Sequence, residues 1–477
     1  MHPIRSVRLS LMMSPLILVA CASVDPIQPE APQLPAHWQQ QVEQDQAQRN
    51  QTKWWLEFDD AALNQLIEKA LQQNYQMQAD LARLRQSQAA WDRAGSGQYP
   101  DLNLTANKSR SWTESDAPNS GDTVTRDTYS LGLTTSYELD FWGSVAAQKQ
   151  QGEFNYLASA QSAQIRANTL AGQVATSWYG YLKEQHNLQL LGKQQQRLSE
   201  GLETVRLRYL RGQVQVSDVW QQEQQLESLN SEMINANAAL QGYQQQLALW
   251  LGQTEFSLTE LGLAEADVQA LPQLANDRKQ LSSEALLQRP DVQAAYFNLQ
   301  AANAGLAVAV ANRYPRFTLT ASYTGSDADI ENVLDNWVAN LAGGLVLPLI
   351  DGDNRRAEVR RNEAVVDEQL ALYHNTLLTA VQETEQAMID EAKQFSLNQS
   401  IDQQLALATK TERYQLNRYQ KGVGDFLAYL TSQQEVLRLE RQQLSANFLV
   451  LQNRVQLLKT ISHQPLIATE NTEGSVQ

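Results

Sequence analysis

The sequence has few cysteines and histidines, and it lacks the common catalytic motifs. Its 477 residues contain one cysteine, which excludes a disulfide within the chain and a zinc site built from several cysteines. The five histidines are scattered and show no metal-ligand spacing. A glycine-rich phosphate loop and the motifs HExxH and GxSxG are absent. The sequence therefore predicts no catalytic residue, no metal site and no bound cofactor, and it does not favour an enzyme.

Positive charge and long apolar runs are also scarce. Asp and Glu number 53 against 37 Lys and Arg, which gives a formal net charge of −16. Because phosphate binding needs a surplus of basic side chains, we expect no nucleic-acid partner. No apolar run reaches the length of a bilayer-crossing helix, which excludes a membrane protein built of helices. A membrane β-barrel is not excluded, because its strands alternate and barely raise the mean hydropathy.

The N-terminal residues resemble the signal of a bacterial lipoprotein. Arg5 and Arg8 precede an apolar stretch over residues 9–20, the pattern of a secretory signal. The stretch ends in Leu-Val-Ala-Cys at Cys21, which resembles the lipobox, and no Asp follows the cysteine. The resemblance implies removal of residues 1–20, a diacylglycerol and a palmitate on Cys21, and export to the outer membrane. The alternative is an ordinary signal with a chance cysteine.

The remainder of the chain contains an internal repeat. Residues 70–106 align without gaps on residues 285–321, an offset of 215. The motif Arg-Tyr-x-Arg-Gly at residues 208–212 matches Arg-Tyr-x-Lys-Gly at residues 418–422, an offset of 210. We therefore predict two copies of one unit joined by an acidic linker. The predicted segments are a signal peptide (1–20), a lipidated tether rich in Pro, Gln and Ala (21–55), a first repeat (56–251), a linker (252–281), a second repeat (282–462) and a polar tail (463–477).

Each copy is predicted to fold as helix, strand, strand, long helix, turn and helix. The first helix is expected over residues 63–95 and again over 283–312. The long helices begin after Gly143 and Gly352 and run for more than sixty residues without proline, which corresponds to roughly 100 Å. They end near Gly212 and Gly422, because glycine adopts the left-handed conformation that terminates a helix and the preceding Arg or Lys complements the helix dipole.

Small and apolar residues recur at steps of three and four along both long helices, a spacing typical of coiled-coil packing. The seam residues are Ala160, Ala163, Ala167, Leu170 and Val174 in the first copy and Leu370, Tyr373, Leu377, Ala380, Thr384 and Ala387 in the second.

Alternating residues predict a pair of strands in each copy. Apolar side chains occupy every second position over residues 317–323, 129–141 (except Thr135) and 337–349 (except Gly343), and the equivalent strand starts near Leu102. These strands are long enough to cross a membrane when tilted, and Trp112, Trp142 and Trp337 fall near strand ends, as in an interfacial aromatic belt. A soluble hairpin with one wet face is the alternative. Four strands cannot close a barrel, so membrane insertion requires that several chains share one.

With this order of helices and strands, the chain resembles the TolC family of outer-membrane factors, in its lipoprotein (NodT-type) branch. The most specific stretch is Ala-Leu-Leu-Gln-Arg-Pro-Asp-Val at residues 285–292, followed by Ala-Ala-Asn-Ala at 301–304 and Tyr-Pro at 314–315. These segments are similar to the family's L-L-x-R-P-D-V, A-A-x-A and aromatic-Pro motifs. One departure is Tyr296, where the family usually has Glu.

The resemblance implies a mainly α-helical protein with membrane strands. Its homotrimer would form one twelve-stranded outer-membrane β-barrel, four strands from each chain, continued by an α-helical barrel through the periplasm. It implies a lipid-anchored protein of the cell outer membrane that contacts outer-membrane lipid. A periplasmic adaptor (membrane fusion) protein and an inner-membrane transporter would open its periplasmic end, so that small compounds leave by a passive duct. The alternatives are the outer duct of a type I protein secretion system and a structural coiled-coil surface lipoprotein.

The resemblance also assigns candidate site residues. Cys21 is the expected lipidation site. The expected adaptor-contact residues at the two helical tips are Tyr209, Arg211, Gly212, Tyr419, Lys421 and Gly422. Asp218 and Asp425 are candidates for a pore constriction, together with Thr431, near which family members often carry an Asp. The alternative is that the tip residues only stop the helices and contact no partner.

Overall fold

The computed structural model describes residues 53–114, 123–259, 271–274 and 286–462. The predicted signal peptide, Cys21, nearly all of the tether, most of the linker and the polar tail lie outside these residues. None of the helices in the described ranges has both the length and the hydropathy needed to cross a bilayer. The main elements are η1 (Trp54–Phe58), α1 (Ala61–Gln73), α2 (Tyr75–Gly95), η2 (Ser96–Gln98), β1 (Asp101–Glu114), β2 (Thr123–Leu139), α3 (Ser144–Leu210), α4 (Val216–Trp250), α6 (Pro290–Ala311), β3 (Arg316–Asp327), η5 (Ile330–Asn332), β4 (Trp337–Val346), α7 (Asn354–Gln420) and α8 (Phe426–Ile461).

The described residues form two compact units, and each unit takes segments from both halves of the chain. The first unit comprises residues 91–152 and 300–367 and holds all four strands. The second comprises residues 53–90, 153–299 and 368–462 and is helical. The predicted combination of long helices with a few strands is confirmed.

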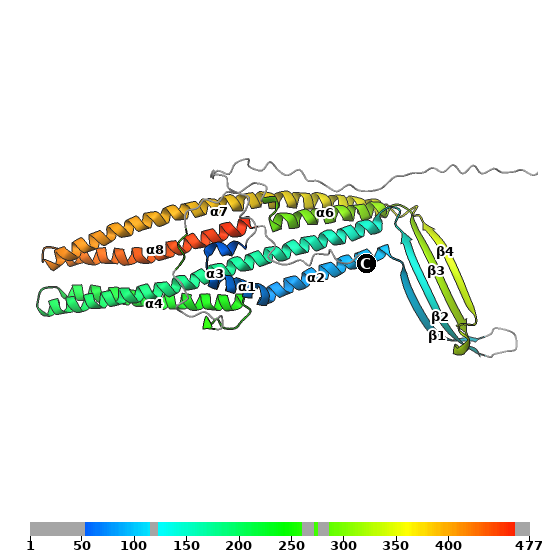
Figure 1. The fold of residues 1–477 in the computed structure, drawn as a ribbon, viewed down its shortest axis with the longest axis horizontal. Coiled ribbons are helices and arrows are strands. Elements are labelled where there is room, and N and C mark those ends of the chain that lie inside the picture. The colour runs from blue at the N-terminus through cyan, green and yellow to red at the C-terminus, as the bar shows by residue number, and fades with distance from the viewer. Residues whose placement is uncertain (1–52, 115–122, 260–270, 275–285, 463–477) are drawn as a thin grey trace, which may run out of the picture. The chain divides into compact units, whose positions relative to one another are not determined.

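The four strands form one antiparallel sheet in the order β1-β2-β3-β4 (Figure 1). Its register places Leu104 opposite Leu133, Leu133 opposite Tyr323 and Tyr323 opposite Ala339. Because successive side chains of a strand point to opposite faces, these rows give the sheet one apolar face, as predicted. β4 ends at Val346, short of the predicted Leu349, because Pro348 cannot donate a hydrogen bond to a strand ladder.

The other face of the sheet carries hydroxyl groups. Thr105 lies opposite Gly132, and Gly132 lies opposite Thr324. A Cβ added to Gly132 would meet the Oγ1 atoms of Thr105 and Thr324 at 3.0 and 3.3 Å. Glycine at the centre of this row therefore makes room for the threonine side chains on both sides.

The two long helices α3 and α7 have 67 residues each. They begin just after Gly143 and Gly352, which have positive φ angles of 74° and 66°. Most residues of the predicted seams are buried, including Ala167 and Val174 on α3 and Leu377 on α7. Figure 1 shows α4 running back beside α3, and α8 running back beside α7. The predicted helical pairs are thus confirmed.

The prediction of one continuous first helix is wrong in both copies, and the two breaks fall at equivalent positions. In the first copy the break is Asn74, whose backbone is extended (ψ 123°). Its Oδ1 accepts the amide of Met77 at 3.0 Å and so caps α2, while its Nδ2 donates to the carbonyl of Trp250 at 3.1 Å. In the second copy, 215 residues later, Arg289 precedes Pro290, which starts α6 at the position where a missing N–H costs least.

Arg289 is buried and fully engaged. Its guanidinium donates to the carboxylates of Asp291 and Glu383 at 2.7 and 2.8 Å and lies within 3.4 Å of the carbonyl of Ala380. Burial lowers the pKa of Arg289, but the hydrogen bonds and charges of Asp291 and Glu383 outweigh that effect and hold the pKa above its ordinary value. The side chain therefore stays charged and ties the start of α6 to α7.

Aromatic residues near the start of the described chain complete the core of the helical unit. Trp54, at the start of η1, is buried, and its Nε1 donates to the Oδ1 of Asn168 on α3 at 2.8 Å. Trp178, also on α3, donates to the Oδ2 of Asp60 at 2.9 Å, and Asp60 caps the start of α1. These bonds fix η1 and α1 against the long helix.

Gly180 permits α3 and α4 to approach each other, and its replacement by alanine is expected to destabilise the protein. A Cβ at this position would lie 2.3 Å from the ring of Tyr243. Alanine usually stabilises a helix interior relative to glycine, but here the ring must move, at an expected cost of about 1–3 kcal/mol. Thermal unfolding of the purified protein followed by circular dichroism measures the effect. Gly192→Ala, where the added Cβ meets nothing within 4 Å, is the control and should not lower Tm.

Candidate functional site

The first helical pair is α3 and α4, and the second is α7 and α8. A short turn joins the two helices of each pair, and the two turns have the same geometry. Gly212 and Gly422 have φ angles of 70° and 71°, the left-handed conformation predicted from the sequence. The amide of Gly212 donates to the carbonyl of Tyr209 at 2.8 Å, and the amide of Gln213 donates to that of Arg208 at 2.9 Å. The same two bonds recur 210 residues later, at 3.0 and 3.1 Å. This is the Schellman ending, in which the carbonyls of the last helical turn are satisfied.

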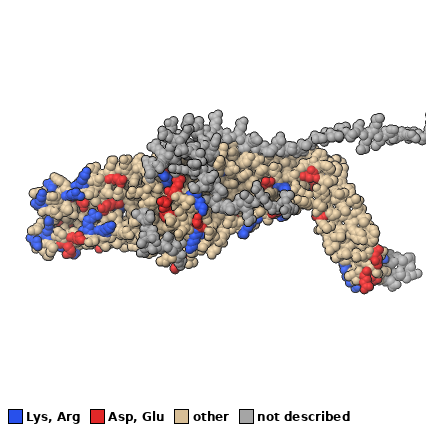
Figure 2. All heavy atoms as spheres, viewed as in Figure 1, with Lys and Arg blue, Asp and Glu red and all other residues tan. Residues whose placement is uncertain are grey.

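Most of the predicted contact residues are exposed at these turns. Arg211 and Lys421 are exposed, and so is Tyr209, at 43%. Tyr419, the equivalent of Tyr209, is instead half-buried. Figure 2 shows Lys and Arg side chains gathered over the end of the helical unit that carries both turns.

An apolar and aromatic cluster lies just behind the turns and joins the two helical pairs. It contains Leu202, Val205 and Val219 of the first pair and Phe426 and Leu430 of the second.

The ring of Tyr419 lies at the edge of this cluster, 5.3 Å from that of Phe426 and nearly parallel to that of Tyr429 at 6.0 Å. The guanidinium carbon of Arg208, on α3, lies 4.5 Å from the centre of the Tyr419 ring, which makes a cation–π contact between the pairs. Sequence reasoning did not select Arg208, Phe426 or Tyr429, although Arg208 is part of the repeated motif.

The three constriction candidates all lie at the start of the returning helices, without direct bonds among them in the described structure. Asp218 is in the first turn of α4 and accepts the amide of Gln215 at 3.4 Å. Asp425 is the residue before α8 and is exposed. Thr431 is exposed further along α8 and donates to the carbonyl of Leu427 at 2.8 Å. Asp218 therefore helps to cap α4, whereas the Asp425 side chain makes no cap hydrogen bond to α8 and contributes only a negative charge, which is favourable at a helix start.

Half-buried charged side chains lie further from the turns, between the helical pairs. Arg197 on α3 pairs with Glu440 on α8 at 3.1 Å, and Gln194 donates to the same carboxylate at 2.7 Å. Burial raises the pKa of nearby Glu412, helped by the charge of Glu440 and opposed by that of Arg197. Burial also raises the pKa of Tyr429, and the charge of Glu412 acts in the same direction. The Tyr429 hydroxyl therefore stays protonated.

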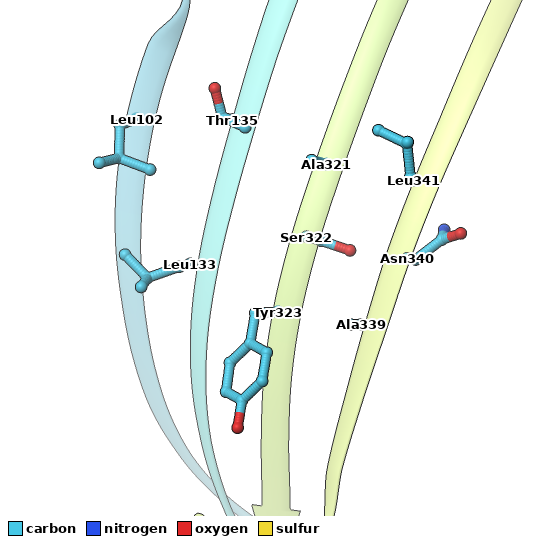
Figure 3. A pocket seen from close by; sticks show the side chains of 9 residues that line it. All are labelled: Leu102, Leu133, Thr135, Ala321, Ser322, Tyr323, Ala339, Asn340 and Leu341. Carbon is cyan, nitrogen blue, oxygen red and sulfur yellow. The ribbon is translucent and has the colours of Figure 1, made fainter.

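The apolar face of the sheet is the second candidate site. A shallow hollow of about 360 Å³ lies on it, lined by Leu102, Leu133, Tyr323 and Leu341. Figure 3 shows these side chains on the four successive strands. All four side chains are exposed. Within this sheet, β1 and β4 each pair with one neighbour, so each has a free edge.

Aromatic and charged side chains lie toward the ends of this face. Trp112 and Trp337 are exposed there, as predicted, whereas Trp142 stacks on Tyr314 at 4.7 Å. Arg110 and Asp127 form a double hydrogen bond, at 2.6 Å each, near the loop between β1 and β2. Figure 2 shows charge at that end and little over the remainder of the visible sheet. An apolar band bordered by aromatic and charged residues is typical of a strand surface that faces lipid.

The described residues contain no group of three or more His, Cys, Asp or Glu side chains arranged to hold a metal ion. Cys21, the predicted lipidation site, lies outside the described residues.

Comparison with known proteins gives consistent matches over most of the chain. The family model described as outer membrane efflux protein matches residues 66–253 and 281–462. The pyoverdine export outer membrane protein OpmQ of Pseudomonas putida is 28% identical over 459 residues, covering 94% of this chain and 95% of the relative. The cation efflux system protein CusC of Escherichia coli is 26% identical over 414 residues, covering 85% and 87%. The open-state structure of the Neisseria gonorrhoeae MtrE outer membrane channel has the same fold, with a TM-score of 0.79 at 21% identity over 92% of this chain and 98% of that one.

Proposed function

The chain belongs to the outer membrane efflux protein family, and on that premise we propose that it is the outer exit duct of a tripartite efflux system for small compounds. Membership makes it an efflux channel protein of the outer membrane. The observation that supports a duct most directly is the sheet, whose register separates an exposed apolar face from a hydroxyl-bearing face. Such a sheet presents one face to lipid and the other to water.

The duct requires more than one copy of the chain. Free edges on β1 and β4 would leave backbone N–H and C=O groups without partners in the hydrocarbon, at several kcal/mol each. Joining β1 of one copy to β4 of the next removes every edge. Three copies of four strands give the twelve-stranded barrel of a homotrimer, and the long helices continue the passage into the periplasm.

The helical tips are proposed to receive a periplasmic adaptor, which connects the duct to an inner-membrane transporter. Arg211 and Lys421 are exposed there, and arginine is enriched at protein interfaces. Asp218, Asp425 and Thr431, at the start of the returning helices, are the proposed constriction residues. The chain itself acts as a passive conduit without catalytic activity, and the transporter supplies the energy and selects the compound.

Ion current through a bilayer tests the conduit. We expect small currents from the purified wild-type oligomer and severalfold larger currents from the double variant Asp218→Ala/Asp425→Ala, because both substitutions remove a favourable negative charge from the start of a returning helix and Asp218→Ala also removes a cap hydrogen bond. Glu368→Ala, an exposed carboxylate on α7, is the control and should behave as wild type. If neither the wild type nor the double variant conducts, the conduit proposal is wrong and a structural lipoprotein is favoured.

Small compounds are proposed as the cargo because relatives are named for exporting them: pyoverdine for OpmQ and cations for CusC. Deletion of the gene should raise intracellular accumulation of at least one small compound, and the intact gene should restore its export. Loss of a secreted protein with no change in any small compound would instead identify a secretion duct.

Cys21 is proposed to anchor the chain through a diacylglycerol and a palmitate, since each buried methylene contributes about 0.8 kcal/mol. Cys21→Ser is therefore expected to abolish incorporation of labelled palmitate. Ser23→Ala, two residues away, should be labelled as the wild type is. Labelling that persists in Cys21→Ser would refute the lipidation site.

A further inference from the structure

Within one chain, Arg208 of the first helical pair contacts Tyr419 of the second pair close to the turns. The guanidinium lies 4.5 Å from the ring centre, and the ring is supported by Phe426 and Tyr429. Each of the two residues has an equivalent in the other copy of the repeat, 210 positions away. The equivalent of Arg208 is Arg418, and the equivalent of Tyr419 is Tyr209.

The equivalent pair does not form within the chain. The guanidinium of Arg418 instead contacts residues of its own helical pair. It donates to the carbonyl of Val423 at 2.9 Å, and its central carbon lies 5.8 Å from the centre of the Tyr414 ring. Tyr209 is 43% exposed. Both halves of the repeat therefore carry the same arginine and tyrosine. Within one chain, Arg208 lies over Tyr419, whereas Arg418 does not lie over Tyr209.

An apolar side chain is also exposed near the first turn: Trp220, in the second turn of α4. Trp220 is 63% exposed, whereas its equivalent in the second copy, Leu430, is 3% exposed because it packs in the cluster between the helical pairs. The equivalent position is therefore buried on the second pair, where it is Leu430, and exposed on the first pair, where it is the larger Trp220.

We propose that a second copy of this chain covers this surface, with Arg418 of one copy lying over Tyr209 of the next and Trp220 buried beside it. Within the chain, the first pair offers the arginine and the second pair offers the tyrosine. Between two chains, the second pair of one chain offers the arginine and the first pair of the next chain offers the tyrosine. The contact is therefore head-to-tail, and each chain contacts one neighbour through its first pair and the other neighbour through its second pair. A contact of this kind closes into a ring when its rotation permits. Internal and inter-copy arginine–tyrosine contacts then alternate around the ring of helical tips.

This inference rests on the proposed homotrimer, and paired cysteines test it. In the full-length protein in membranes, Tyr209→Cys/Arg418→Cys treated with a short bismaleimide is expected to give covalent dimers and trimers on denaturing gels. Arg208→Cys/Tyr419→Cys is the matched control, and it should link within one chain and keep the monomer mobility. The wild type and each single variant should give no product, because Cys21 lies far along the chain from both turns and is expected to be acylated.

A second measurement separates a ring contact from an adaptor contact. Tyr209→Ala is expected to lower the fraction of oligomer that survives detergent severalfold, while Tyr209→Phe keeps the ring and should restore it. Native mass spectrometry of the wild type supplies the reference. A monomeric wild type overturns the proposed homotrimer itself. A trimeric wild type whose Tyr209→Cys/Arg418→Cys variant gives no inter-chain product, although the control pair links, overturns only the proposed contact. A Tyr209→Ala variant with an intact oligomer overturns it as well.

Discussion

Arginine in place of Leu133 is expected to remove the protein from the outer membrane, whereas arginine at the adjacent Thr134 is expected to leave it there. Leu133 lies on the apolar face of β2, between Leu104 and Tyr323 of the neighbouring strands. A charged side chain facing lipid near the middle of the bilayer costs about 2–4 kcal/mol, and a homotrimer carries that cost in every copy. Thr134 points to the hydroxyl-bearing face, where arginine remains in water.

Membrane fractionation followed by gel mobility with and without heating measures this outcome. Depletion of Leu133→Arg from the outer membrane, with normal amounts of Thr134→Arg, is the expected result. Equal amounts of both variants in the outer membrane would contradict the assignment of the apolar face to lipid. Depletion of Thr134→Arg alone would show that the two faces are reversed.

Loss of the Arg454 guanidinium is expected to produce the largest destabilisation in the helical unit. Arg454 on α8 donates to the carboxylate of Glu391 on α7, and the two side chains are only 7% and 9% exposed. Arg454→Met leaves a buried carboxylate without its partner, which typically costs about 3–5 kcal/mol. A clear fall in Tm of the purified oligomer is the expected result.

Two further variants isolate the cause. Arg454→Met/Glu391→Leu removes both charges and should recover most of the stability, because no buried charge is left unpaired. Arg438→Met breaks an exposed pair with Glu435 on the surface of α8, and its effect should stay below about 1 kcal/mol. A double variant as unstable as Arg454→Met would mean that packing, and not the unpaired carboxylate, explains the loss.

The regular parts of the fold could be predicted because they depend on local patterns. The period of two along residues 317–323 placed the apolar face, and Gly212 and Gly422 placed the turns, since left-handed backbone favours glycine. The break at Asn74 could not be predicted in this way. Its neighbours are good helix formers, and the bond that holds it extends to Trp250, 176 positions along the chain.

The contact between Arg208 and Tyr419 shows a different limit. The repeated motif contains both residues, but it also contains Arg418 and Tyr209. From the sequence alone, a contact between Arg418 and Tyr209 is as plausible as the contact between Arg208 and Tyr419. Only the packing of α3 against α7 and α8 distinguishes them, because it places one tyrosine ring under an arginine and leaves the other exposed. Copies of a sequence can thus share a motif while their surroundings assign it different contacts.

The hydroxyl-bearing face of the sheet has a consequence for ion selectivity. Between Ser130 and Ser136 on β2, and between Thr320 and Ser326 on β3, the side chains on this face are serine, threonine or glycine. Channels discriminate between cations and anions through rings of charged side chains, and these stretches of the described strands supply none. Short hydroxyls exchange hydrogen bonds with passing solutes as readily as with water. We therefore expect this part of the wall to add no preference between cations and anions, so that any charge selectivity of the duct arises elsewhere along it.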